Sequence, residues 1–267
     1  MGGPAEQKAL LDWYFEAGVD EAIGDKPINR FNAKQTAAQM TTVNESETGR
    51  AVRRQTEPSV PLQSRNAAVY TAQEIAAAAS NLEELHNALQ EFDGCPLKET
   101  AMNFVFADGH ADARLMFVGE APGAEEDRKG IPFVGPAGQL LDKMLASIRV
   151  VRSDVYITNI LPWRPPGNRK PTDTEIATCL PFLERHISLV DPDILLLVGG
   201  TSAKTLLRRK EGIMRLRGKW MTYEPATGDP IAARAMLHPA YLLRQPAQKR
   251  EAWLDLQEIR ARLDETI

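Results

Sequence analysis

The chain has 267 residues, of which 43% are hydrophobic and 25% charged, and its formal net charge is −4. This is the composition of an ordinary globular protein that can bury a sizeable core, which excludes collagen-like and wholly disordered chains. There is no run of about 18 apolar residues and no basic-then-apolar leader, so the sequence predicts neither a membrane span nor a signal peptide. Its two cysteines, Cys95 and Cys179, are far apart, which argues against a disulfide framework and favours a reducing cytoplasm.

Charge is unevenly distributed along the chain. Residues 201–250 hold eleven Lys or Arg against three acids, whereas residues 1–100 hold nine bases against fifteen acids. This polarity fits a basic face that binds nucleic acid, with an acidic amino-terminal part turned away from it. It fits equally well a pair of solvated helix faces, so charge alone leaves both interpretations open.

The amino-terminal third predicts two helices separated by a polar linker. An amphipathic pattern predicts a helix within residues 1–24, and a stretch rich in Gln, Thr, Ser and Asn predicts a flexible linker over residues 25–68. An Ala-rich pattern predicts a second helix over residues 71–92. We therefore expect one folded domain at residues 69–267, preceded by a helical extension.

Four short apolar runs follow, each ending in a polar or glycine-rich loop: RLMFVGEAPG, VYITNILPW, DILLLVGG and AARAMLHPAYLLR. Helical patterns lie between them at residues 136–148, 172–190 and 201–210, and Thr172 with Glu175 matches a capping box. Alternating strands and helices predict a three-layer α/β/α domain with a central, mainly parallel four-stranded sheet. In such sheets the ligand lies at the carboxyl ends of the strands, where all four loops converge.

Three of these loops carry residues suited to chemistry. In the first, Gly119 and Gly123 permit close approach of the backbone, and the neighbouring acids disfavour a phosphate ligand. In the second, Asn159 ends a strand with an amide that both donates and accepts, as reading the edge of a base requires. In the third, His238 precedes adjacent leucines in a basic loop, a combination suited to a wedge between stacked bases. A turn-forming Asn159 and a structural His238 are the alternatives on local grounds.

Together these loops resemble family 4 of the uracil-DNA glycosylase superfamily. The segments GEAPGAEEDRKGIPFVGPAGQLLDKML, VYITNILPWRPPGNRKPTDTEIATCLPFL, LRGK and HPAYLLR occur in the family's order over about residues 92–260. The resemblance implies a DNA repair enzyme that flips uracil out of DNA and hydrolyses its N-glycosidic bond, leaving an abasic site and free uracil. It also implies a monomer in the cytoplasm, at the nucleoid, and fits a bacterial origin.

The resemblance assigns roles to individual residues. It implies that Asn159 reads the Watson–Crick edge of uracil, Phe133 stacks on the base and His238 stabilises the departing anion. Glu120 and Glu126 are implied to orient or activate the water. Further uracil-binding residues are implied at Gly119, Ala121 and Gly123, and DNA-binding residues at Leu242, Leu243, Arg244, Arg164, Asn168 and Arg169.

Two positions depart from family 1 of the superfamily. Where this chain has Ala121, family 1 has an Asp, so the general base is less defined here and leaving-group stabilisation carries more of the barrier. Where this chain has Gly123, family 1 has a Tyr that blocks the methyl group of thymine. We therefore expect a looser pocket that admits other deaminated bases.

The iron–sulfur site of family 4 is incomplete in this chain. The family holds a [4Fe–4S] cluster on four cysteines, and this chain retains only Cys95 and Cys179, with Phe92 and Trp163 at the other two positions. Two thiolates do not replace four, and two aromatic side chains fill the volume that close packing requires. We predict no metal and no cofactor, with an apolar plug in place of the cluster. The alternative is a cluster held by His or Asp substitutes.

Three other functions are weighed against the glycosylase. Relatives that attach covalently to uracil-containing DNA carry a Lys/Arg-rich insertion with an added His before PFVG, and the segment EDRKGIPFVG has neither. A non-catalytic repair scaffold is disfavoured because the implied catalytic residues are all present. Generic dinucleotide binding is disfavoured because the chain has no GxGxxG motif.

Overall fold

The computed structural model describes residues 65–265. The helix predicted at residues 1–24 and most of the linker predicted at residues 25–68 lie outside this part, so the proposed domain boundaries stay a prediction. The helices are α2 (Arg65–Ala78), α3 (Leu82–Glu91), α4 (Ala124–Lys129), α5 (Pro136–Ser147), α6 (Asp173–Val190), α7 (Gly200–Leu206), α8 (Ile213–Leu216), α9 (Pro239–Arg244) and α10 (Lys249–Glu265). None of the helices in residues 65–265 has the length and apolar character of a membrane span.

The strands form one mixed sheet. They are β1 (Ala107–Gly109), β2 (Leu115–Gly119), β3 (Tyr156–Asn159), β4 (Ile194–Val198), β5 (Trp220–Tyr223) and β6 (Ile231–Met236), in the order β1-β3-β2-β4-β6-β5. The four central strands are parallel, as predicted, and β1 and β5 pair antiparallel at the two edges. The expected number of four strands was therefore too small. The edge strands escaped prediction because both are short and largely half-exposed, so they lack the continuous apolar runs of buried parallel strands.

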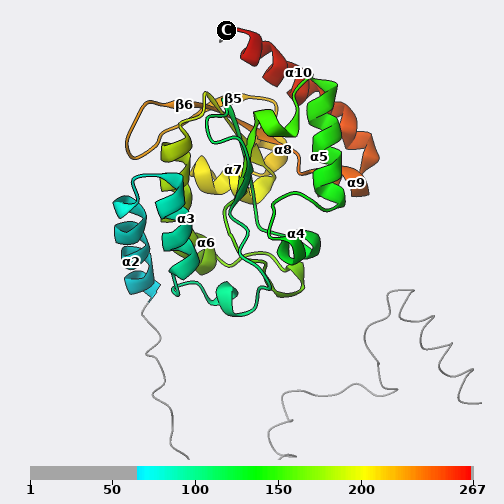
Figure 1. Cartoon of the computed structure of the whole chain (residues 1–267). Coiled ribbons are helices and arrows are strands. Elements are labelled where there is room, and N and C mark those ends of the chain that lie inside the picture. Colours follow the sequence, from blue (N-terminus) through cyan, green and yellow to red (C-terminus); the bar gives the residue numbers. More distant parts are fainter. Residues whose placement is uncertain (1–64, 266–267) are drawn as a thin grey trace, which may run out of the picture. The chain divides into compact units, whose positions relative to one another are not determined.

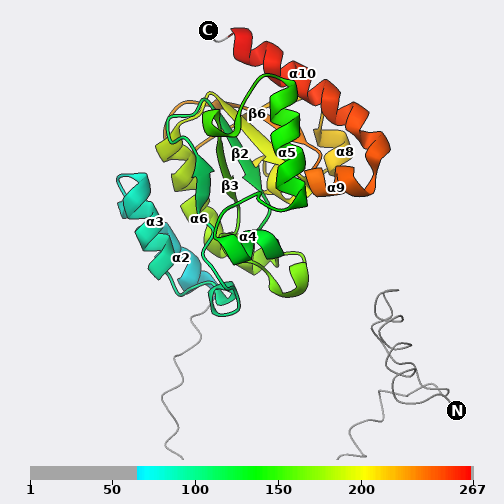
Figure 2. The same ribbon diagram turned by 45° about the vertical axis from the view of Figure 1, so that its right-hand side comes forward.

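Alternate residues of the central strands pack into two separate cores. Met116 and Val118 of β2 belong to the core under α3 and α6, whereas Leu115 and Phe117 belong to the core under α5 and α10. This division follows from the period of two in a strand, which sends successive side chains to opposite faces. Figures 1 and 2 show α2, α3 and α6 on one side of the sheet and α5, α9 and α10 on the other. The predicted three-layer α/β/α arrangement is confirmed.

The helices between the strands are largely where the sequence predicts them, with one exception. The patterns at residues 136–148, 172–190 and 201–210 correspond to α5, α6 and α7, and the capping box at the start of α6 is present. The single helix predicted over residues 71–92 is wrong, because the chain forms α2 and α3 instead. Asn81 caps α3 by accepting a hydrogen bond from the backbone N–H of Glu84 at 2.9 Å. An Asn side chain favours such a capping bond over a place inside a continuous helix, so a new helix begins after Asn81.

A buried ionic network fixes α10 to the sheet. Asp255 of α10 is fully buried and accepts hydrogen bonds from Arg217, which follows α8, and from Arg234 of β6, both at 2.9 Å. Arg217 also donates to the carboxylate of Glu251 at 2.8 Å. The arginine of the LRGK segment is therefore a structural residue that joins α8, β6 and α10.

We expect Asp255→Asn to lower the free energy of unfolding by about 3 kcal/mol, because the buried Arg234 guanidinium loses its paired carboxylate and the partly buried Arg217 retains only that of Glu251. In thermal denaturation this corresponds to a decrease in Tm of about 6–12 °C for a domain of this size. The matched control is Asp264→Asn, which breaks the more exposed pair of Asp264 with Arg260 and is expected to cost at most about 1 kcal/mol. Equal shifts for the two variants would contradict the assigned role of the network.

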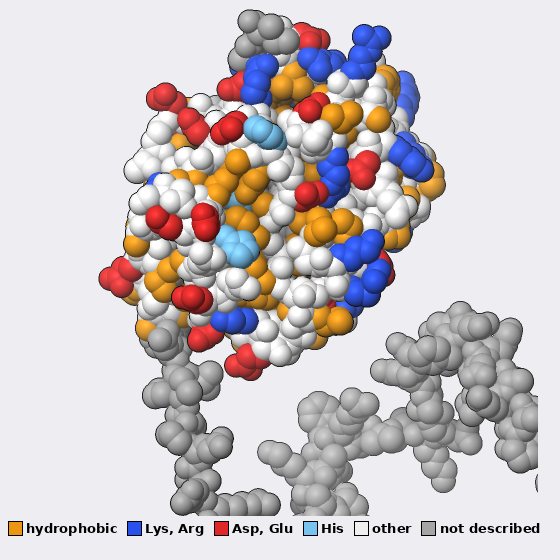
Figure 3. All heavy atoms as spheres, in the orientation of Figure 1, with side chains coloured by type: hydrophobic (Ala, Val, Ile, Leu, Met, Phe, Trp, Pro, Cys, Tyr) orange, Lys and Arg blue, Asp and Glu red, His pale blue; other side chains and the backbone are white. Residues whose placement is uncertain are grey.

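Acidic and basic side chains are unevenly distributed on the face that Figure 3 shows. In Figure 3 acidic groups gather mainly on the side where α2 and α3 lie, and most Lys and Arg gather on the side of α5, α9 and α10. This arrangement agrees with the uneven charge along the sequence. It favours the second side for approach to a polyanion.

Candidate active site

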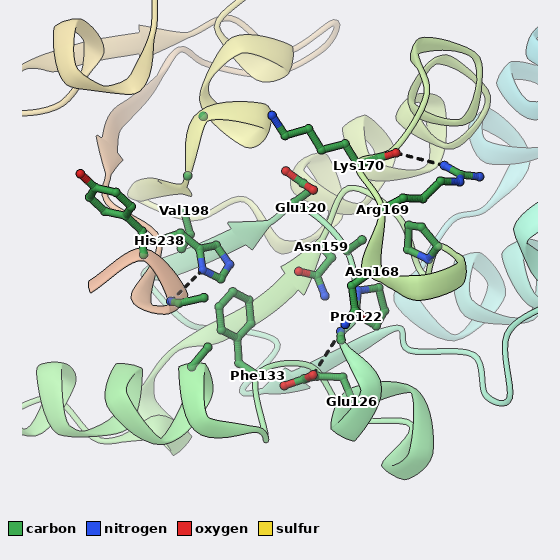
Figure 4. A pocket seen from close by; sticks show the side chains of 18 of the residues that line it. Glu120, Pro122, Glu126, Phe133, Asn159, Asn168, Arg169, Lys170, Val198 and His238 are labelled. Carbon is green, nitrogen blue, oxygen red and sulfur yellow. Dashed lines mark hydrogen bonds between the residues drawn. The ribbon is translucent and has the colours of Figure 1, made fainter. Parts of the chain in front are cut away.

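One pocket of about 420 Å³ lies at the carboxyl ends of the parallel strands. This is the place where open α/β sheets bind ligands. Figure 4 shows side chains from separate loops around one space. Of the predicted site residues, the following line it: Glu120, Ala121, Gly123, Glu126, Phe133, Asn159, Asn168, Arg169, His238 and Arg244. The predicted residues outside its lining are Gly119, Arg164, Leu242 and Leu243.

Phe133 supplies an aromatic wall to the pocket. Its backbone has a φ of +52°, in the left-handed region that non-glycine residues rarely adopt. Its ring lies beside the imidazole of His238, with ring centroids 5.7 Å apart and planes 25° apart. Strained backbone of this kind persists only when the surroundings hold it, and it clusters at functional sites.

Arg152 holds this strained segment in place, a role that no sequence signal indicated. Its guanidinium donates to the carbonyl oxygens of Phe133 at 3.0 Å and Pro132 at 2.6 Å. It also pairs with Asp108 of β1 and Asp142 of α5. The fork of five donors suits an arginine to this task. The aromatic wall of the pocket is thereby fixed to the sheet and to α5.

Asn159 lies at the end of β3 with its amide directed into the pocket (Figure 4). The residue is only 7% exposed, and its side chain makes no hydrogen bond to another residue within 65–265. Because the amide faces the pocket, its donor and its acceptor are available to a ligand. Gly119 makes room for it, because a Cβ at Gly119 would clash with the Asn159 amide and lie 2.8 Å from the Phe133 ring.

His238 caps α9 and faces the pocket with its second ring nitrogen. Its Nδ1 accepts a hydrogen bond from the backbone N–H of Ala240 at 3.1 Å. Burial, reinforced by the positive charge of Arg244, lowers the pKa of His238 to about 4. The imidazole is therefore neutral at pH 7. Because Nδ1 is an acceptor, the proton resides on Nε2, which points toward the side of the pocket where Asn159 lies (Figure 4).

The two predicted carboxylates differ in what they contact. Glu126 accepts hydrogen bonds from the backbone N–H groups of Gly123, Val134 and Gly135 at 2.8–3.1 Å, so both of its oxygens are engaged. Glu120 accepts one hydrogen bond at Oε2, from Thr201, at 2.5 Å, and its Oε1 makes none to residues 65–265. Glu126 therefore organises the loop around the pocket, and Glu120 is the carboxylate with an oxygen available for water.

The comparison with protein families agrees with this geometry. The family model described as the uracil DNA glycosylase superfamily matches residues 106–257, which contain every lining residue named above. The chain belongs to the uracil-DNA glycosylase superfamily. It is 41% identical over 180 residues to a Type-4 uracil-DNA glycosylase of Pyrobaculum aerophilum, an alignment that covers 66% of this chain and 91% of the relative.

Two further Type-4 relatives match over similar spans. The enzyme of Archaeoglobus fulgidus is 38% identical, over 67% of this chain and 92% of its own length. The enzyme of Thermotoga maritima is 36% identical, over 66% of this chain and 87% of its own length. The resemblance to family 4 drawn from the loop motifs is thus confirmed, whereas the roles of individual residues stay proposals.

The predicted DNA-binding residues of this uracil-DNA glycosylase superfamily member differ in their exposure and in their bonds to other residues. Leu242 is 1% exposed and belongs to the core under α5, whereas Leu243 is 44% exposed. Arg169 makes a bidentate pair with Glu175, at 2.6 and 2.9 Å. Arg164 donates to Asn168 at 2.8 Å. The side chains of Arg164, Asn168 and Arg169 therefore bond to other residues of the protein. The buried Leu242 is not placed to act as a wedge between bases.

Two cationic side chains at the pocket have no ion-pair partner among the described residues. They are Lys170, which lines the pocket from the segment before α6, and Arg244, which lines it from the end of α9. Sequence reasoning overlooked Lys170, although it directly follows the predicted Arg169. Only the ion pair of Arg169 with Glu175 distinguishes Arg169 from Lys170, and this ion pair is seen only in the folded structure.

The positions of the family's cluster ligands do not fit a four-iron cluster. Phe92 and Trp163 are 5% and 2% exposed, Cys95 and Cys179 are 1% exposed, and the Phe92 ring lies 5.1 Å from that of Phe182. A cluster needs four ligands around one space, and of the four residues that the resemblance assigns to this role only Cys95 and Cys179 carry a thiol. Within residues 65–265 no group of three or more His, Cys, Asp or Glu is arranged to hold a metal ion.

Proposed function

We propose that this uracil-DNA repair glycosylase binds uracil, flipped out of DNA, in the pocket formed by Phe133, Asn159 and His238. The observation that carries the proposal is the buried Asn159 amide, which has no partner within the described residues and faces the pocket. The amide groups are open to the pocket, so a base that matches them exchanges its hydrogen bonds with water for hydrogen bonds with Asn159.

The amide discriminates uracil from cytosine by its donor and acceptor pattern. Uracil offers an N3–H donor beside an O4 acceptor, which match the Asn159 carbonyl and NH₂ groups. Cytosine offers an acceptor and a donor in the reverse order, so it mismatches the amide in the orientation that binds uracil. Sites built in this way reject the wrong partner by about 10⁴–10⁵-fold. Phe133 supplies the stacking surface, and Arg152 holds it in position.

The reaction is proposed to run as a hydrolysis driven by the leaving group. The N1–C1′ bond breaks with its electron pair going to uracil, and the neutral His238 donates a hydrogen bond from Nε2 to O2 of the resulting anion. Water adds to C1′ of the cationic sugar and gives up a proton to Glu120. The products are an abasic deoxyribose and the uracil anion, which becomes uracil by taking up the proton that Glu120 releases. A neutral donor fits the pKa of about 4 that burial gives His238.

Contact with the DNA is proposed to rest on the exposed and uncommitted side chains at the mouth of the pocket. Leu243 is the exposed leucine of α9 and is proposed to fill the gap left by the flipped base. Lys170 and Arg244 are proposed to bind flanking phosphates, since no anion within the described residues pairs with them. Arg169, Arg164 and Asn168 are proposed to shape this loop, because their side chains bond to one another or to Glu175.

The range of bases is proposed to extend beyond uracil. A Cβ at Gly123 would lie 2.8 Å from Oε2 of Glu126, so a side chain there would displace the carboxylate that organises the loop. This chain therefore has no room for the tyrosine of family 1 that blocks a methyl group. Deaminated bases other than uracil are the proposed additional substrates.

We propose that this enzyme works without the family's iron–sulfur cluster. Purified under anaerobic conditions, it is expected to show no absorption band near 400 nm, because two thiolates replace the usual four ligands. The double variant Phe92→Cys/Trp163→Cys restores the family's ligand set and is expected to gain this band after reconstitution with iron and sulfide. The matched control Phe92→Ser/Trp163→Ser, without the thiols, is expected to stay colourless. A band in the unmodified protein would contradict the proposal.

The proposed function is tested on labelled oligonucleotides that carry uracil, cytosine or thymine at one position. Hot alkali cleaves abasic sites, so the proposal predicts cleavage at uracil and none at cytosine. A parallel denaturing gel without alkali detects covalent adducts, which belong to the alternative function of the superfamily. Absence of any uracil-dependent product would contradict the proposed activity.

A further inference from the structure

The hydroxyl of Thr201 contacts the carboxylate proposed to activate water. Its Oγ1 donates to Oε2 of Glu120 at 2.5 Å, across 81 positions of sequence. Thr201 stands in the first turn of α7, and it is not among the residues that line the pocket. It therefore contacts Glu120 without itself lining the space where the base and water are proposed to bind.

The start of α7 is fixed with respect to the strand that carries Glu120. The next residue, Ser202, is fully buried and donates to the backbone carbonyl oxygen of Val118 in β2 at 2.7 Å. Val118 is two positions before Glu120. Because two consecutive side chains of α7 bond to the end of β2, the Thr201 hydroxyl has a defined position relative to the carboxylate.

We propose that Thr201 is a positioning residue that orients Glu120 for attack by water. The hydrogen bond occupies Oε2 and sets the rotation of the carboxylate, so Oε1 is the oxygen that accepts the water's hydrogen bond. Without the hydroxyl the carboxylate rotates more freely, and the water is held in the reactive geometry for less of the time. Small losses of orientation are costly in reactions that depend on proximity. This inference rests on the proposed role of Glu120.

The test is single-turnover excision of uracil with excess enzyme, measured beside the equilibrium affinity for uracil-containing DNA. Thr201→Val keeps the size and branching of the side chain but removes the donor. It is expected to slow excision about tenfold while the affinity for DNA stays within twofold. Thr201→Ser retains the hydroxyl and is expected to restore the rate to within about twofold. Ser202→Ala, which removes the neighbouring anchor without touching Glu120, serves as the control for a purely structural effect.

A double-mutant cycle separates action through Glu120 from action on the DNA. In a Glu120→Ala background, Thr201→Val is expected to cause no further loss, because the group it positions is gone. A full tenfold loss in that background, or a loss that appears only in affinity for DNA, would overturn the inference. So would an unchanged rate for Thr201→Val or for Glu120→Ala alone. Each of these results leaves the glycosylase activity of the unmodified protein, and hence the proposed function, standing.

Discussion

Replacement of His238 by asparagine is expected to slow uracil excision in single turnovers by about 10²–10³-fold, the usual effect of removing one donor to a developing anion. Asparagine is a good N-cap, so this variant keeps the bond to the Ala240 N–H that starts α9. It removes the Nε2–H donor together with the ring that lies beside Phe133. The exposed His110 provides a control, since His110→Asn is expected to leave the rate unchanged.

The pH dependence tests the charge of the same imidazole. Burial lowers the pKa of His238 to about 4 from the ordinary value near 6.5. The excision rate of the unmodified enzyme is therefore expected to show no inflection near pH 6.5. An inflection there that His238→Asn abolishes would mean that the imidazole works as a cation, contrary to the proposal.

The same shift affects stability in a defined direction. With a folded pKa below the unfolded pKa, the unfolded state binds more protons between pH 6.5 and pH 4, so the free energy of unfolding decreases as the pH falls through that window. His238→Asn is expected to remove this contribution. Denaturant unfolding at pH 7 and pH 4.5 for the two proteins measures it.

The central sheet could be predicted from the sequence because its strands are buried on both faces. Runs such as RLMFV and DILLLV need no knowledge of their neighbours to be recognised. The edge strands β1 and β5 depend on pairing with β3 and β6, and nothing local in ADG or WMTY signals that pairing. The break between α2 and α3 depends on a single cap at Asn81. In the sequence this one signal is weaker than the surrounding Ala-rich helical pattern, so the break was not predicted.

The sequence indicated which residues lie at the candidate site, but not which hydrogen bonds they make there. Strand ends and loop motifs indicated Asn159, Phe133 and His238. Sequence spacing could not separate Glu120 from Glu126, because the N–H groups that engage Glu126 come partly from the later segment at residues 134–135. The leucine pair was assigned to a loop, whereas it lies on α9, where consecutive residues point about 100° apart. That rotation buries Leu242 and exposes its neighbour Leu243.

Substitution of Asn159 is expected to affect both the rate and the choice of base. Asn159→Ala removes the groups that pair with the edge of uracil, and we expect excision of uracil to fall by about 10²–10³-fold with no activity gained on cytosine. The strand end itself is retained, because Asn159 pairs with β2 through its backbone. Unchanged Tm for the variant is therefore expected and is measured alongside.

Asn159→Asp has the same shape but exchanges the amide for two acceptors. A carboxylate still accepts from N3–H of uracil, but it repels O4 and the charge that develops on the leaving base, so excision of uracil is expected to fall as well. Toward cytosine the same carboxylate accepts a hydrogen bond from the N4 amino group. The rate of uracil excision divided by the rate of cytosine excision is thus expected to decrease by at least about tenfold relative to the unmodified enzyme. An Asp variant that loses uracil activity while keeping the full ratio would show that the pocket reads the base through groups other than Asn159.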